Sequence, residues 1–131
     1  MSKTLVSTVV LVLVMTASAI AGNWNVPVSF KGLTNPAGRT AAAVDAGRRI
    51  FLARCARCHG PMGAGDGEDG ARAPYDLRTI MAGLTEGELF WKVTHGVGKM
   101  PSFAGILTER ERWLVVTYMG TFSERPQAER R

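Results

Sequence analysis

Two cysteines and a histidine lie close together near the middle of the chain, in the run Cys55-Ala56-Arg57-Cys58-His59. Thiols at this spacing can form a redox dithiol or supply half of a zinc site. The chain has only two cysteines and two histidines, too few for a zinc site made from these ligands, and it lacks the βαβ pattern of a thioredoxin-like dithiol. A Cys-x-x-Cys-His run is the attachment signature of c-type haem. We therefore predict one haem c, bound through two thioether bonds to Cys55 and Cys58, with His59 as an iron ligand.

Met100 is the predicted ligand on the other side of the iron. It follows Gly98 and Lys99 in a glycine-containing loop, and Pro101 stiffens the backbone directly after the sulfur donor. A thioether is a soft donor that favours reduced iron, so ligation by histidine and methionine raises the reduction potential. The predicted metal ligands are therefore His59 and Met100.

Three other methionines and the second histidine are alternative ligands. Methionine usually fills hydrophobic cores, which is the role we expect for Met81 and Met119. Met62 lies only three residues after His59 and is tied to the same side of the haem. His95 would give bis-histidine ligation and a lower potential, but a histidine at a helix end commonly stabilises the helix dipole or is solvated. An open sixth position would instead permit gas sensing or peroxidase-like chemistry.

Helices are predicted to position these residues, and the fold class is all-α. Thr40 can cap a helix that runs to about Cys55, because Val44, Gly47, Phe51 and Cys55 fall on one helical face. Gly47 lacks a side chain at a point where another helix can cross closely. This helix would deliver the first cysteine to the site.

Two capping boxes predict further helices. Residues Thr85–Glu88 begin a helix that ends near Gly96, and residues Thr108–Glu111 begin another that stops near Gly120. No convincing alternating strand pattern is present. The apolar wall expected around the haem consists of Phe51, Leu89, Val93, Phe103 and Leu114.

The glycine-rich run at 63–70 is predicted to be a loop around the cofactor. Residues 65–70 match Gly-x-Gly-x-x-Gly, but no strand precedes them, and Asp66, Glu68 and Asp69 would repel a pyrophosphate. We therefore reject a dinucleotide site. A short helix is expected where residues 73–78 return the chain.

The start of the chain has the features of a secretory signal peptide. Lys3 is followed by the apolar run 5–14 and then by small residues that end at Ala21. We expect cleavage after Ala21, and Ala17-Ser18-Ala19 offers a second cleavage site. An uncleaved anchor is the alternative, although the apolar run falls short of the ~20 residues that span a bilayer. The predicted organisation is a signal peptide at 1–21, an extended arm at 22–39, a cytochrome c domain at 40–122 and a polar tail at 123–131.

Over residues 40–122 the chain resembles the single-haem class I c-type cytochromes, small exported bacterial proteins. The motifs that carry the resemblance are Gly47 and Phe51 before the Cys-x-x-Cys-His-Gly run, Met100-Pro101-x-Phe103, and Trp113 through Tyr118.

The resemblance implies a small helical domain wrapped around one covalently attached haem. It also implies that the first and last helices cross where Gly47 and Phe51 meet Val115 and Tyr118. A backbone carbonyl, here that of Pro74, is expected to accept a hydrogen bond from the histidine ligand, which would hold the ring and raise its basicity.

These features predict a non-enzymatic, soluble periplasmic carrier that moves one electron at a time between respiratory redox partners. A dehydrogenase, a membrane cytochrome complex or a terminal oxidase are the expected partners. The main alternative is a haem c subunit of a membrane or periplasmic dehydrogenase or oxidase complex. A haem sensor, a peroxidase-like enzyme and a non-haem metal-binding protein are further alternatives.

The net charge of +5 does not indicate a nucleic-acid partner, because the chain has no recognition motif and is predicted to be exported. No small-molecule substrate is expected either. Basic residues near the haem edge would favour an acidic redox partner; otherwise they form a solvated surface. The candidates are Arg54, Arg57, Arg72, Arg78, Lys92 and Lys99.

Overall fold

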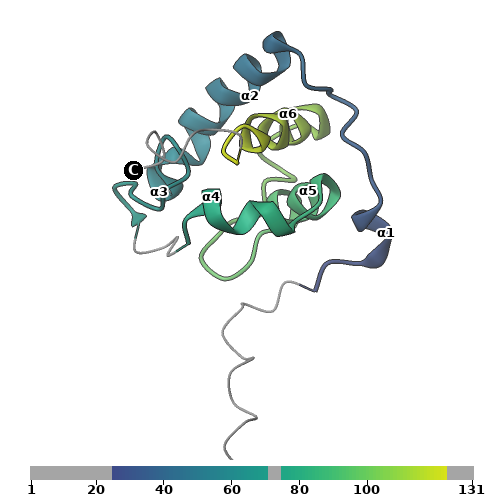
Figure 1. Ribbon diagram of the computed structural model, residues 1–131. Helices are drawn as coiled ribbons and strands as arrows, with labels where there is room; N and C mark the ends of the chain where they lie inside the picture. The colour runs from purple at the N-terminus through teal and green to yellow at the C-terminus, as the bar shows by residue number, and fades with distance from the viewer. Residues whose placement is uncertain (1–24, 71–74, 124–131) are drawn as a thin grey trace, which may run out of the picture.

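Helices account for the regular structure of this chain, as the sequence predicts. The computed structural model describes residues 25–70 and 75–123 (Figure 1). Within these two stretches there is no strand, and one isolated bridge joins Val97 to Met100. The all-α fold class is therefore confirmed. The elements in chain order are α1 (Val28–Lys31), α2 (Ala41–Arg54), α3 (Ala56–His59), α4 (Leu77–Ile80), the 3-10 turn η2 (Met81–Gly83), α5 (Glu86–His95) and α6 (Glu109–Gly120).

Several predictions concern residues outside the described part of the chain. The signal peptide at 1–21 and the tail beyond Ser123 lie there, as do Arg72 and Pro74. These remain predictions. Of the helices in the described part, none combines the length and the apolar character that crossing a membrane requires.

Helix α2 begins where the sequence predicts. Thr40 has an extended backbone, and its hydroxyl accepts a hydrogen bond from the Ala43 amide at 3.1 Å. This bond satisfies one of the N–H groups that lack a partner within the helix. The helix ends at Arg54 and Cys55 is its C-terminal cap, so α2 delivers Cys55 to the site.

Helices α2 and α6 form the most extensive contact between elements and cross one another in Figure 1. Gly47 makes this crossing possible. A Cβ atom at Gly47 would overlap the backbone carbonyl oxygen of Leu114 and would lie 3.0 Å from Cβ of Tyr118. One turn later, the Phe51 ring packs edge-on against Tyr118 with centroids 5.4 Å apart. The predicted contact of Gly47 and Phe51 with Tyr118 is therefore confirmed, but the other residue nearest Gly47 is Leu114 and not the predicted Val115.

Helices α5 and α6 both begin with the predicted capping boxes. The Thr85 hydroxyl accepts from the Glu88 amide at 3.2 Å, and the Glu88 carboxylate accepts from the Thr85 amide at 2.8 Å. Thr108 and Glu111 make the same two bonds at 3.2 and 2.8 Å. These reciprocal bonds fix the starts of both helices.

Stacked aromatic rings hold α5 against α6. The rings of Phe90 and Trp113 are nearly parallel, with centroids 3.9 Å apart. The guanidinium carbon of Arg112 lies 5.4 Å from the Phe90 ring centroid, within cation–π range. The two helices are thereby held together beside the region that contains the predicted site.

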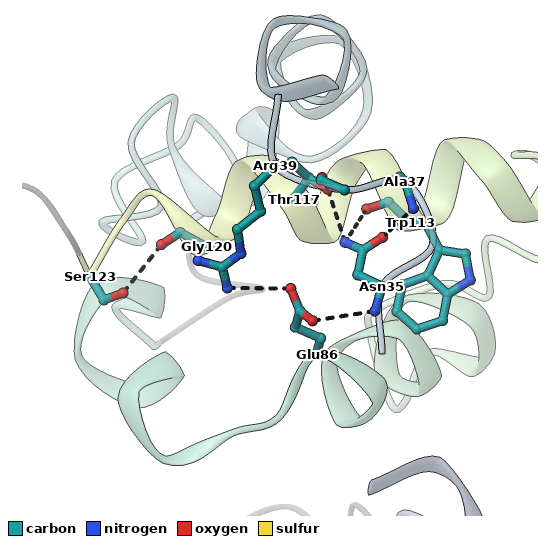
Figure 2. Close-up of polar contacts among 9 residues, drawn as sticks. Asn35, Ala37, Arg39, Glu86, Trp113, Thr117, Gly120 and Ser123 are labelled. Carbon is teal, nitrogen blue, oxygen red and sulfur yellow. Dashed lines mark hydrogen bonds and ion pairs between the residues drawn. The ribbon is translucent and has the colours of Figure 1, made fainter. Parts of the chain in front are cut away.

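The segment before α2 differs from the extended arm that the sequence predicts, because it contains α1 and is hydrogen-bonded to two helices (Figure 2). The buried Asn35 side-chain amide donates to the Trp113 carbonyl at 3.1 Å and to the Thr117 hydroxyl at 2.9 Å. The Glu86 carboxylate accepts from the Asn35 backbone amide and from Arg39, both at 3.3 Å. Local turn-forming residues carry no signal for contacts with residues 78 positions later.

Candidate functional site

The predicted attachment residues lie on a single helical turn. Helix α3 follows Cys55 directly, and the amides of Cys58 and His59 both donate to the Cys55 carbonyl oxygen, at 3.2 and 2.9 Å. Gly60 then redirects the chain with a φ of 76°, which residues with a side chain rarely adopt. A Cβ atom at Gly60 would also overlap the Asp66 carboxylate. The turn therefore holds both thiols and the imidazole on one short segment.

A largely apolar cavity of about 760 Å³, its open mouth included, adjoins this turn. Cys55 and His59 line the cavity, and so does Met100 from the loop after α5. Cys58 is not among the lining residues. The structure thus brings three of the four predicted cofactor-binding residues to one cavity, with the fourth on the same turn as two of them.

The apolar wall is largely as predicted. Leu114 is the exception, because it lies at the crossing with α2, where its carbonyl faces Gly47. Val115 lines the cavity in its place, and Met119 does so one turn later. Every residue from Trp113 to Met119 is buried, so an apolar stripe could not identify the cavity-facing side of α6. The predicted wall residues that do line the cavity are Phe51, Leu89, Val93 and Phe103.

The His59 imidazole is suited to bind a metal. Its Nδ1 atom is buried and has no hydrogen-bond partner among the described residues. Burial lowers the pKa of His59, which favours the neutral ring that binds metals. The predicted partner of the ring, the carbonyl of Pro74, belongs to the part of the chain that is not described.

Cys55 and Cys58 are not joined by a disulfide bond. Burial, with a smaller contribution from Cys58, raises the pKa of Cys55 to about 12. The Cys55 thiol therefore lies in a desolvated, apolar part of the site.

The loop that carries Met100 is fixed by backbone hydrogen bonds. Helix α5 ends at Gly96, whose φ is 65°, and a Cβ atom there would lie 2.5 Å from the Met100 carbonyl oxygen. The Val97 amide donates to the Met100 carbonyl at 3.0 Å, and the Met100 amide donates back to Val97 at 2.9 Å. Beyond Pro101, the Ser102 hydroxyl donates to the Thr94 carbonyl at 2.7 Å. The loop therefore folds back onto α5 and holds Met100 at the cavity.

His95 is engaged elsewhere. Its ring stacks on Trp91 with centroids 4.5 Å apart, and its Nδ1 atom lies 2.9 Å from the Trp91 carbonyl oxygen. The Phe30 ring meets His95 edge-on at 6.2 Å. His95 is exposed and is not among the cavity-lining residues.

Two of the other methionines also face the cavity. Met81 and Met119 are buried core residues, as expected, and both line the cavity, whereas Met62 does not. Met100 differs from them because it is half-buried and lies in a loop. Any test of the sulfur ligand therefore needs Met81 and Met119 as controls.

Two of the basic residues predicted near the haem edge form ion pairs. Arg57 Nε lies 2.9 Å from the Asp69 carboxylate, and Arg78 Nη2 lies 2.6 Å from the Asp76 carboxylate. The hydrogen bond from Arg78 lowers the pKa of Asp76. Lys92 lines the cavity, while Arg54 and Lys99 are exposed.

Taken together, the residues at the cavity fit a covalently attached haem c. They supply a thiol with a second thiol on the same turn, a buried imidazole nitrogen without a partner in the described chain, and a thioether. The apolar walls suit a large hydrophobic macrocycle, and histidine and methionine are known haem ligands.

Comparison with known proteins agrees with this assignment. Residues 42–119, more than half of the chain, match the protein family described as cytochrome c oxidase, cbb3-type, subunit III. The chain is 31% identical over 96 residues to cytochrome c6 of Picosynechococcus sp., covering 64% of this chain and 77% of that protein. It is also similar to a chain of the reducing HAO-like protein complex of Kuenenia stuttgartiensis, with a TM-score of 0.59, 30% sequence identity and 70% of this chain covered. The match spans only 47% of that solved chain.

Proposed function

We propose that this chain, a member of the c-type cytochrome family, transfers single electrons through a closed, six-coordinate haem site. The cbb3-type subunit III match and the cytochrome c6 relative show the family, and its members carry covalent haem c, as this chain does. In this proposal Cys55 and Cys58 hold the haem, and His59 and Met100 are the iron ligands. The observation that carries the proposal is that His59 and Met100 line the same apolar cavity.

The bound haem supplies a reversible one-electron couple between Fe(II) and Fe(III). The chain's own residues restrict what that couple can do. An imidazole and a thioether that both stay bound leave no position for oxygen or peroxide. Apolar walls that include Phe51 and Leu89, both buried, limit the access of water. We infer that the protein is an electron carrier and not an enzyme.

The proposed location is the periplasm. The signal-like residues 1–21 support export, and bacterial attachment of haem c occurs outside the cytoplasmic membrane. Redox proteins are the proposed partners, among them a dehydrogenase, a membrane cytochrome complex or a terminal oxidase. Neither a nucleic acid nor a small-molecule substrate is part of this proposal.

A haem c subunit in a larger assembly is the second candidate. Two observations favour it: the matched family is named for an oxidase subunit, and a similar solved chain belongs to a multi-protein complex. Size-exclusion chromatography of the native protein from its source distinguishes the two functions. A free carrier elutes at the size of one copy of the exported protein, whereas a subunit co-elutes with larger proteins that share its haem absorbance.

Replacement of the proposed sulfur ligand tests the closed site. Met100→Leu keeps an apolar side chain of similar size but removes the sulfur donor, so the holoprotein should lose its low-spin spectrum, bind carbon monoxide when reduced and show a lower potential. Met81→Leu and Met119→Leu are matched controls from the same cavity, and they should keep the wild-type spectrum. An unchanged spectrum in the Met100 variant, with a changed one in either control, would assign the ligand to another methionine.

A further inference from the structure

Lys92 places a positive charge in the wall of the cavity. Among the cavity-lining residues that the structure describes, Lys92 alone carries a formal charge at neutral pH. It lies on α5 between Leu89 and Val93, which are buried and line the same cavity. The aliphatic part of a lysine side chain can follow an apolar wall of this kind while its ammonium reaches toward the mouth.

Glu88 is the acidic residue on the same helix whose charge acts on Lys92. Glu88 lies one turn earlier on α5, where its carboxylate accepts from the Thr85 amide at 2.8 Å and lies 3.7 Å from the ammonium of Lys31. The Glu88 carboxylate therefore interacts with the ammonium groups of both Lys31 and Lys92. Burial lowers the pKa of Lys92 and the charge of Glu88 opposes that effect, so the ammonium is partly desolvated.

We propose that the Lys92 ammonium raises the reduction potential of the haem site and is its potential-tuning residue. This inference rests on the proposed electron-carrier function. Reduction adds one electron from an external redox partner, no bond forms or breaks, and the site loses one unit of positive charge. A fixed positive charge in a low-dielectric wall therefore repels the oxidised state more than the reduced state. Removal of that charge should make reduction less favourable.

The test is a potential measurement on the purified holoprotein. Lys92→Gln removes the charge, and an optical redox titration with small-molecule mediators of known potential measures the effect. The equilibrium constant for reduction should fall roughly three- to tenfold, and a tenfold change corresponds to about 59 mV for one electron. Lys92→Arg keeps the charge and should retain the wild-type potential. Lys99→Gln is the matched control, because Lys99 is exposed and is not among the cavity-lining residues.

Ionic strength separates a wall charge from a surface charge. The shift caused by Lys92→Gln should persist in about 1 M salt, where the Debye length falls to about 3 Å and exposed charges are screened. An equal potential in wild type and Lys92→Gln, or an equal shift in Lys99→Gln, would overturn the inference. If Lys92→Gln yields too little holoprotein, Lys92→Leu suits the apolar wall and is held to the same outcomes.

The two proposals fail in different ways. A wild-type protein without a reversible one-electron couple, or with a high-spin spectrum that responds to carbon monoxide, would contradict the proposed function. A normal couple that does not respond to the charge at residue 92 would contradict only the role of Lys92. The absorption spectrum of every variant is recorded first, so that a shift in potential is interpreted only where the iron ligation is unchanged.

Discussion

The hydroxyl of Tyr118 on α6 donates a hydrogen bond to the carbonyl oxygen of Pro61 at 3.2 Å. The two residues are 57 positions apart, and Pro61 follows the attachment turn by two residues. The Tyr118 ring is 2% exposed and packs edge-on against Phe51 and Phe122, with centroids 5.4 and 5.1 Å away. The last helix therefore holds the loop of the proposed haem site through both packing and a hydrogen bond.

Tyr118→Phe is expected to loosen this loop without disturbing the aromatic packing. Loss of one neutral hydrogen bond should lower the free energy of unfolding by about 0.5–1.5 kcal/mol. Urea denaturation of the holoprotein, followed by haem absorbance, measures the change. Val28→Ala, at an exposed position away from the cavity, is the control and should change stability little. A Tyr118 variant as stable as that control would mean that the bond to Pro61 does not hold the loop.

Gly47→Ala should be among the most destabilising small substitutions in the chain. The added methyl group would overlap the Leu114 carbonyl oxygen, which is backbone and can move only if α2 and α6 separate. Overpacking of this kind typically costs about 1–3 kcal/mol. Gly105→Ala is the control, because a Cβ atom there meets nothing within 4 Å. Equal unfolding midpoints for the two variants would show that the helices do not cross closely at Gly47.

The elements that could be predicted from sequence are those with local signals. Thr40, Thr85 and Thr108 mark helix starts, because a capping hydroxyl and its partner amide lie three residues apart. The attachment turn is equally local. A loop containing glycine and proline is also a local feature, and the structure places the loop that carries Met100 against the cavity.

The incorrect predictions required knowledge of tertiary contacts. Leu114 and Val115 are adjacent apolar residues in the part of α6, 113–119, where every residue is buried. Only the crossing at Gly47 therefore determines which of them faces the cavity. Asn35 does form a local turn, in which its side-chain oxygen accepts from the Ala37 amide at 2.9 Å, but its side-chain amide is also hydrogen-bonded to α6. No local pattern could predict either contact.

Asn35→Ala is predicted to detach the N-terminal segment from α6. The Asn35 amide satisfies the Trp113 carbonyl and the Thr117 hydroxyl at a buried position, and the loss of a buried polar partner costs about 1–3 kcal/mol. Urea unfolding should show this loss, and limited proteolysis should cleave the segment before α2 sooner. Asn25→Ala, at an exposed position, is the control. Identical stability and cleavage rates for both variants would contradict an anchoring role for Asn35.

The capping carboxylate of α5 should make stability depend on acid pH. Hydrogen bonding by the Thr85 amide lowers the pKa of Glu88 below its ordinary value of 4.5. A lowered pKa in the folded state means that Glu88 contributes stability above pH 4.5, and that this contribution is lost as the pH falls through the folded-state pKa. Wild type should therefore exceed Glu88→Gln in free energy of unfolding near pH 7, by about 0.5 kcal/mol for a carboxylate near the surface. The two should converge once the pH falls below the folded-state pKa of Glu88. Glu68→Gln, in an exposed loop position, is the control, and its free energy of unfolding should follow that of wild type across the pH range. A Glu88→Gln variant that also followed wild type would exclude the capping contribution.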